Sequence, residues 1–245
     1  MKQLNRETLA EQVADAIAKL IETEQLAPGD SLPSTVKLAE NFGVSRPVIR
    51  EALKTLEGRE VLTISNGRTA MVKPITSDGL RNFFAHAIAL DRQSLIELLE
   101  VRNGLEVRSA ALAAINATEA DIADLEKTLI RMRQCLSDPT SYTELDVGFH
   151  TQIAAATKNK LMFLLIESIR DALANTIQEG LRSRFNSEQF ERVQELHELV
   201  FDSIKSRDHT RAAEAMMKHF NDAINAILRA EILQKELDSN ENLDK

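Results

Sequence analysis

Residues 34–58 decide the fold of the N-terminal part of the chain, and they read STVKLAENFGVSRPVIREALKTLEG. Ser34 and Ser45 each stand where a helix can begin, because a serine hydroxyl can accept a hydrogen bond from a backbone N–H of the first turn. Gly43 lies between the two segments and can adopt the left-handed conformation that ends a helix. The stretch therefore predicts two short helices joined by a glycine turn.

The second of these helices has two different faces. One face carries the apolar residues Ile49, Ala52, Leu53 and Leu56, which predicts packing against a core. The other carries Arg46, Arg50 and Lys54 at positions i, i+4 and i+8. Such a face suits the major groove of DNA, where an arginine can bond guanine O6 and N7. The simpler alternative is that this basic face is only exposed to solvent and binds nothing. The sequence on either side of the two helices distinguishes this alternative from DNA binding.

The flanking sequence completes a DNA-binding layout. Residues 7–24 have the apolar spacing of an amphipathic helix. After Gly58, two strand-like runs at 61–64 and 70–73 enclose Asn66-Gly67, a dipeptide typical of hairpin turns because both residues tolerate positive φ. Three helices and a two-stranded wing are the layout of a winged helix-turn-helix. In this layout Lys54 and Arg68 suit contacts with phosphates, which position a domain on DNA.

The same region resembles the GntR family of bacterial transcription regulators. The resemblance rests on the following segments: Leu26 to Ser34 (LAPGDSLPS), Leu38-Ala39, Gly43 to Arg46, Arg50 to Leu53 and Leu56-Glu57. It implies that Arg46 and Arg50 contact bases and that Gly67 marks a wing tip approaching the minor groove. Where the family commonly has arginine this chain has Val36, with Lys37 beside it. The DNA-binding candidates are Lys37, Ser45, Arg46, Arg50, Lys54, Gly67 and Arg68.

The charge of the chain is unevenly distributed. The 245 residues include 30 Lys+Arg and 38 Asp+Glu, a formal net charge of −8, which for the whole chain argues against a nucleic-acid binder. Residues 1–75, however, hold ten basic and ten acidic side chains, so the entire excess of acid lies in the remainder. Such asymmetry indicates two modules with different partners.

Composition excludes several other classes of protein. The single cysteine, Cys135, rules out a disulfide framework and a Cys-rich zinc site. The sequence has neither an apolar run of the ~18–20 residues that a membrane span needs nor a signal peptide. We therefore expect no membrane partner and a cytoplasmic bacterial protein that is nucleoid-associated when bound to DNA.

Beyond residue 78 the sequence has helical periodicity almost throughout. The expected helices are 79–90, 93–116, 118–136, 140–157, 160–183, 187–206 and 208–236. These predict a mainly α protein in which the winged helix is followed by an all-α antiparallel bundle of six or seven helices. The expected division is a DNA-binding domain (1–75), a linker or linker helix (76–85), a helical domain for metal, effector and dimerisation (86–236), and a disordered tail (237–245).

Four residues of this second part can bind a metal ion. Asp146 and His150 are four apart and so share one helix face, while His197 and His219 lie in later helices. Three imidazoles and a carboxylate suit zinc, with nickel or manganese as alternatives, and leave coordination positions open. From the residues alone, hydrogen-bonded core histidines are the simpler interpretation.

A second resemblance favours the metal. Residues 86–231 are similar to the all-helical FCD domain of the FadR branch, whose pattern of one Asp and three His matches Asp146, His150, His197 and His219. Leu99 to Glu106 (LEVRNGLE) resembles that family's Glu-x-Arg helix, which implies that Arg102 faces an effector pocket. An open metal and an arginine suit a small organic carboxylate. His86 and His209 match nothing in the pattern.

These features predict a homodimeric, metabolite-responsive transcription regulator. The resemblance implies a repressor that leaves a palindromic operator when its organic-acid effector binds. A metal-dependent enzyme is one alternative, with Glu100 or Glu106 as an acid or base, although none of the common catalytic motifs occurs. The other alternative is a regulator whose signal is the metal itself.

Overall fold

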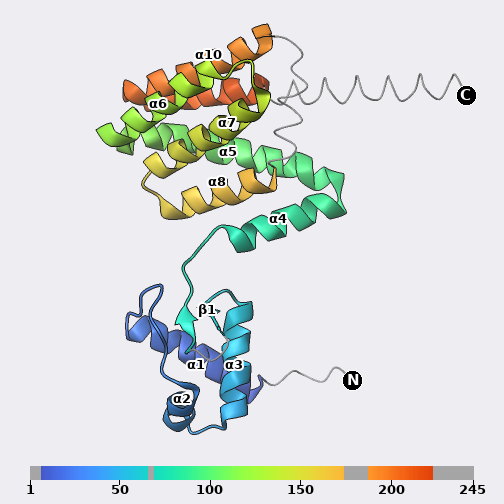
Figure 1. Ribbon diagram of the computed structural model, residues 1–245, viewed down its shortest axis with the longest axis vertical. Helices are drawn as coiled ribbons and strands as arrows, with labels where there is room; N and C mark the ends of the chain where they lie inside the picture. The colour runs from blue at the N-terminus through green and yellow to red at the C-terminus, as the bar shows by residue number, and fades with distance from the viewer. Residues whose placement is uncertain (1–6, 66–68, 174–186, 223–245) are drawn as a thin grey trace, which may run out of the picture. The chain divides into compact units, whose positions relative to one another are not determined.

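The computed structural model describes residues 7–65, 69–173 and 187–222, and the chain divides into two compact units, Met1–Thr76 and Ser77–Lys245 (Figure 1). The predictions for the wing turn at Asn66, Gly67 and Arg68, for a helix reaching residue 183 or 236, and for the tail at 237–245 fall outside the described residues.

The first unit has the predicted order of elements. It contains α1 (Leu9–Thr23), α2 (Thr35–Phe42), α3 (Arg46–Gly58), β1 (Leu62–Thr63) and β2 (Met71–Val72). The helix α1 packs against α3, which also contacts α2 and β1. Buried Ile17, Leu38, Ile49 and Leu56 form the centre of its core, where each side chain contributes about 1.5–3 kcal/mol by leaving water. The apolar face predicted for α3 is confirmed.

The ends of α2 and α3 explain the sharp turn between them. The Ser34 hydroxyl accepts a hydrogen bond from the Lys37 backbone N–H at 3.3 Å, and Gly43 ends α2 with φ at 64°. Ser45 stands at the predicted start of α3, but its hydroxyl makes no capping hydrogen bond, so that part of the prediction is wrong.

The wing is bound to the body of the unit by a third segment of chain. Leu62 pairs with Val72 and Thr63 with Met71 in an antiparallel ladder. On its other side β2 exchanges hydrogen bonds with residues 29–32: the Gly29 N–H donates to the Val72 carbonyl, and the Val72 N–H donates to the Asp30 carbonyl, both at 2.9 Å. Backbone groups on both edges of β2 are therefore satisfied.

The second unit is helical in all its described elements, as predicted. These are α4 (Asp78–Leu90), α5 (Arg92–Asn116), α6 (Glu119–Gln134), α7 (Pro139–Ala156), α8 (Lys160–Ala172), α10 (Ser187–Lys205) and a helix over 209–222. The helix α7 contacts α5, α6 and α8, while α5 contacts α4, α7, α8 and α10, so these two helices hold the bundle together (Figure 1). Within the described residues, no helix is long and apolar enough to cross a membrane.

The expected linker at 76–85 is not a separate segment. The helix α4 packs against α5 and α8, and its Phe84 and Ile88, four residues apart on one face, contact the bundle core. The burial of this apolar face places α4 in the second unit, and the boundary between the units falls between Thr76 and Ser77.

The start of α6 supplies a test of stability against pH. The Asp121 carboxylate accepts hydrogen bonds from the Thr118 N–H at 2.7 Å and hydroxyl at 2.6 Å, and pairs with Lys158 at 2.6 Å. Burial alone would raise the pKa of Asp121, but the bonds from Lys158 and Thr118 lower it from 3.8 to about 2. Because the folded pKa is the lower one, the stabilisation is present above pH 3.8 and is lost as the pH falls through about 2.

We therefore expect Asp121→Asn to lower the free energy of unfolding by about 1 kcal/mol at neutral pH, the usual value of a capping interaction. Urea denaturation at a series of pH values should show this difference disappear towards pH 2. Asp124→Asn, an exposed change on the same helix, is the control and should leave stability within about 0.5 kcal/mol of wild type. A pH-independent deficit in Asp121→Asn would contradict the assignment.

Candidate functional site

The helix α3 presents a basic face to solvent. Arg46, Arg50 and Lys54 are exposed along α3, while Ile49 and Leu53 on its opposite face are buried. The Ser45 side chain at the start of the helix is also exposed. The structure therefore places four of the predicted DNA-binding side chains along one accessible surface.

In having no carboxylate partner these cations differ from three other described basic residues of the unit. The paired ones are Lys37 with Glu40 at 3.5 Å, Arg59 with Asp15 at 2.6 Å, and Lys73 with Glu60. Among the described residues, Arg46, Arg50 and Lys54 make no ion pair. Their charge therefore remains available to phosphates and base edges.

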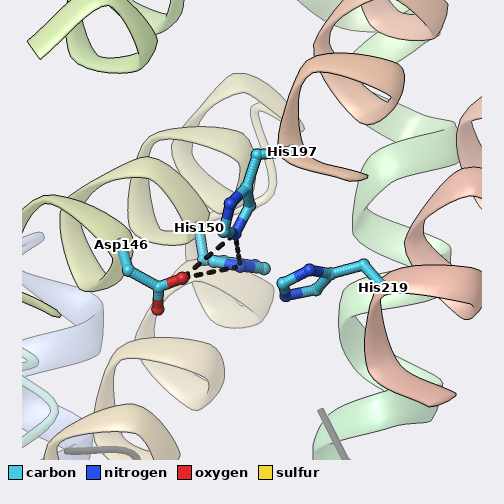
Figure 2. A group of neighbouring side chains, drawn as sticks. All are labelled: Asp146, His150, His197 and His219. Carbon is cyan, nitrogen blue, oxygen red and sulfur yellow. Dashed lines mark hydrogen bonds and ion pairs between the residues drawn. The ribbon is translucent and has the colours of Figure 1, made fainter. Parts of the chain in front are cut away.

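The second unit brings together the four predicted metal ligands (Figure 2). Asp146 and His150 come from α7, His197 from α10 and His219 from the helix over 209–222. One nitrogen or oxygen atom of each lies within 4.8 Å of those of the others, and all four residues are buried. His197 Nε2 lies 3.0 Å from Asp146 Oδ1 and 3.3 Å from His150 Nε2. This cluster is called the His–Asp centre below.

The electrostatics of the His–Asp centre suit a divalent cation. Burial lowers the pKa of His150 from 6.5 to about 4 and holds that of His219 well below its usual value, helped by the neighbouring His197 and His150. These imidazoles are therefore neutral near pH 7, the state in which histidine binds metals. The buried Nδ1 of His219 has no hydrogen-bond partner in the described part of the chain. The donor set thus fits zinc or a similar ion.

Arg102, the predicted effector ligand, lies next to the His–Asp centre. It is buried on α5, its Nε donates to Glu106 Oε1 at 2.7 Å, and its guanidinium lies 4.9 Å from the centre of the Phe220 ring. Its two terminal amino groups bond to no other described residue. Arg102 can therefore still bind a carboxylate through these groups.

A second buried arginine, Arg170 of α8, escaped the sequence analysis. Its Nη2 donates to Asp146 Oδ2 at 2.8 Å, and its Nη1 donates to Glu106 Oε1 at 3.0 Å. The side chain is completely buried. A signal for it exists in the sequence, because Arg170 follows Ile166 by four residues and precedes Leu173 by three, and so occupies the buried face of its helix.

Arg170 and Arg102 neutralise the carboxylates of this region. Burial alone would raise the pKa values of Glu106 and Asp146, yet both are held well below their usual range. The neighbouring groups that lower these pKa values are His150, Arg102 and Arg170 for Glu106, and His197, His150 and Arg170 for Asp146. The two arginines therefore balance the two carboxylates in formal charge.

Glu106 also orients a predicted ligand. Its Oε2 contacts His150 Nδ1, which can donate its proton to this carboxylate. The lone pair of His150 is then on Nε2, the nitrogen that faces His197 and Asp146. A carboxylate behind a histidine is a common way to fix a metal ligand. His86 and His209, which match no part of the pattern, are exposed and lie outside the His–Asp centre.

The winged helix with an unpaired basic face and the separate helical unit define a DNA-binding transcription regulator. Residues 9–72 match the model of bacterial regulatory proteins of the gntR family, and residues 97–222 match the FCD domain. The chain therefore belongs to the GntR family and is one of its members with an FCD domain.

Individual relatives agree with this assignment. The chain is 30% identical to the HTH-type transcriptional regulator LutR of Bacillus subtilis over 202 residues, which is 82% of this chain and 92% of LutR. It is 27% identical to the Glc operon transcriptional activator of Escherichia coli K12 over 220 residues, 87% of each chain. It is 28% identical to the HTH-type transcriptional repressor NanR of Citrobacter rodentium over 231 residues, 90% of this chain and 85% of NanR.

The fold agrees as well. A solved GntR structure from Streptococcus agalactiae superposes with a TM-score of 0.69 at 26% identity, covering 87% of this chain and 97% of that one. The matching families and relatives are transcription regulators and not enzymes, so the enzymatic alternative is wrong.

The buried charges make a prediction about stability. Arg170→Met should lower the free energy of unfolding by about 3–5 kcal/mol in EDTA, because the change leaves Glu106 and Asp146 short of a cation in the core. Urea denaturation followed by circular dichroism measures this. Lys205→Met, which removes an exposed partner of Glu126, should cost no more than about 1 kcal/mol. Equal effects of the two changes would show that Arg170 is not needed to neutralise the site.

Proposed function

We propose that this protein is a metabolite-responsive repressor that binds a palindromic operator as a homodimer and leaves it when a small organic carboxylate binds at the His–Asp centre. It would act in the bacterial cytoplasm, on the nucleoid when bound to DNA. The observation that carries the proposal is the combination of an unpaired basic helix face in one unit with a buried His–Asp centre beside an arginine in the other.

On DNA, Arg46 and Arg50 contact base edges in the major groove and Lys54 contacts phosphates. Ser45 and Lys37 of the helix-turn-helix make further contacts with the DNA, Arg68 of the wing contacts phosphates, and Gly67 marks the wing tip that approaches the minor groove. Two such units in a dimer place their recognition helices in successive major grooves, about 34 Å apart, so the operator has the two-fold symmetry of the protein. The exposure of Arg46, Arg50 and Lys54 supports this assignment.

The metal is a divalent ion, zinc in the first place and nickel or manganese as alternatives, held by Asp146, His150, His197 and His219. When bound, it supplies positive charge and open coordination positions for an oxygen ligand. Because the two arginines balance the two carboxylates, an added divalent ion leaves an excess of positive charge in the core, which a small anion offsets. The terminal amino groups of Arg102 provide a second contact for the carboxylate.

The effector acts by shifting a population of conformations. An anion that binds more tightly to the conformation with poor operator affinity favours that conformation, and the coupling typically amounts to about 1–3 kcal/mol. The name of NanR, a repressor, supports this direction of control. The name of the Glc operon activator supports the opposite direction, so a transcription assay with and without effector decides between the two.

Arg50→Ala tests the DNA-binding surface. We expect specific operator affinity to fall by about 5–150-fold, the equivalent of 1–3 kcal/mol for a lost contact to a base. Gel-shift titration with promoter DNA from the protein's own operon measures this loss. Arg59→Ala is the matched control, because Arg59 is paired with Asp15, and it should bind as wild type does. Full specific affinity in Arg50→Ala would exclude α3 as the recognition helix.

His150→Ala tests the His–Asp centre. The variant should lose metal uptake, measured by elemental analysis after dialysis, and its response to effector, while it keeps much of its operator affinity. His86→Ala, a change of an exposed histidine, should affect neither property. Normal effector binding by metal-free His150→Ala would show that the proposed site is wrong.

A thermal-shift screen of small organic acids with and without EDTA identifies the effector class. Stabilisation by an acid only when metal is present supports a metal-bound carboxylate, since a ligand stabilises the state that it binds. If operator affinity instead follows the concentration of free zinc with no acid present, the metal itself is the signal.

A further inference from the structure

The exposed face of α3 carries an acid as well as the three cations. Glu51 follows Arg50 directly, precedes Lys54 by three residues, and is exposed. The residues that hold α3 against the core of its unit are buried, and they are Ile49, Ala52, Leu53 and Leu56. With about 100° between successive residues of a helix, the direction opposite to these four falls between Lys54 and Glu51, about 30° from each. Glu51 therefore points away from the core as directly as Lys54 does.

The carboxylate of Glu51 has no partner in the described part of the chain, neither a cation nor a hydrogen-bond donor. Other acids of the unit are occupied, such as Glu40 with Lys37. Glu57, the next acid on α3, accepts a hydrogen bond from the Ile64 N–H at 3.1 Å, which joins the end of the helix to the end of β1. Both carboxylate oxygens of Glu51 are therefore open to a donor from outside the protein.

A carboxylate in this position is unfavourable for binding DNA in general. DNA carries one negative charge for every ~1.7 Å of its axis, so the cations of α3 gain affinity from the phosphates whereas Glu51 loses it. This cost is offset only where a hydrogen-bond donor of a base meets the carboxylate. Glu51 therefore weakens binding to most sequences and favours those that present a donor at the right place.

The chemistry of the base edges identifies that donor. Arginine and lysine side chains only donate, so Arg46, Arg50 and Lys54 can bond acceptors such as guanine O6 and N7. The donors in the major groove are the amino groups at adenine N6 and cytosine N4. Adenine also presents the acceptor N7 beside its amino group, which repels the second carboxylate oxygen, whereas cytosine presents no acceptor there. Cytosine is therefore the base that a carboxylate fits best.

We propose that Glu51 is a specificity-determining residue of α3 that accepts a hydrogen bond from cytosine N4, so that each half of the operator contains a C·G pair at the position facing Glu51. This proposal rests on the recognition of DNA by α3 proposed above and adds a base to it. Neighbouring arginine and glutamate give one helix both kinds of hydrogen-bonding group. A wrong base pair at this position weakens binding by about 5–150-fold, as is typical of a mismatch in a specific site.

Selection from a pool of random-sequence DNA duplexes tests the proposal with the full-length protein. Wild type should select a motif with C·G at one position of each half-site, and Glu51→Ala should select the same motif without a preference there. Glu51→Gln should prefer A·T at that position, because a glutamine amide can bond adenine N6 and N7 together. Alanine and glutamine are both good helix formers, so these changes at an exposed position keep α3 intact. An unchanged motif in Glu51→Ala would overturn the proposal.

A titration of two duplexes by gel shift separates base reading from simple repulsion. One duplex is that selected by wild type, and in the other a single C·G pair facing Glu51 is replaced by T·A. We expect wild type to prefer the first by about 5–150-fold and Glu51→Ala to prefer it by no more than about twofold. If Glu51→Ala binds both duplexes more tightly but discriminates as wild type does, Glu51 only repels DNA and the proposal is overturned.

Glu22→Ala is the matched control, because it removes an exposed carboxylate of α1 in the same unit. It should select the wild-type motif and discriminate between the two duplexes as wild type does.

A parallel selection with Arg50→Ala separates this proposal from the one on which it rests. If wild type selects no motif, or if Arg50→Ala selects the wild-type motif at full affinity, recognition by α3 is refuted and the role of Glu51 with it. If Arg50→Ala alters the motif and Glu51→Ala does not, α3 is the recognition helix and only the role of Glu51 is refuted.

Discussion

The packing of the second unit depends on the neutralisation of two carboxylates that are buried away from water. Glu106 and Asp146 are buried carboxylates, and Arg170 reaches both of them from a third helix. A bare carboxylate in such a core would cost several kcal/mol, so the helices α5, α7 and α8 can pack closely only with this arginine between them. The arrangement also determines what the centre can bind, because Glu106 orients His150 and Asp146 is held ready beside it. The contacts of Arg170, Glu106 and Asp146 therefore stabilise the fold and also determine which ligand the His–Asp centre can bind.

The two units use charge in opposite ways. In the first, the cations Arg46, Arg50 and Lys54 remain in water without carboxylate partners, where they can meet a polyanion. In the second, Arg102 and Arg170 are enclosed and matched to carboxylates. The net charge of −8 is a sum over both units, so it shows neither the exposed cations of the first nor the buried ion pairs of the second. Within 31–73 the other described basic residues, Lys37, Arg59 and Lys73, are paired with acids, so a count of charges in this segment does not show that the cations of α3 are unpaired.

Much of this could be predicted from the sequence because it follows from local periodicity. The glycine turn after α2, the two faces of α3 and the i, i+4 pair of Asp146 and His150 all depend on neighbours within a few residues. Local pattern also predicted the helices of the second unit but left open whether α4 is a linker helix or part of the bundle, since the periodicity of Phe84 and Ile88 does not tell what covers them. Ser45 stands at the predicted start of α3, but the capping hydrogen bond expected of its hydroxyl is absent. The contacts of Arg170 could not be derived, because its partners are 24 to 64 residues away in the sequence and meet it only through packing.

The position of His219 has a consequence for the newly made protein. Chains emerge from the ribosome from the N-terminus onwards, at about 5–20 residues per second. The basic helix α3 is complete at Gly58, whereas the last of the four clustered side chains comes 161 residues later, in the final described helix. In a nascent chain, the DNA-binding helix α3 is therefore synthesised seconds before the His–Asp centre is complete. A messenger RNA truncated before codon 219 encodes the DNA-binding unit but not His219. Under the proposed function, the truncated protein therefore does not respond to the effector.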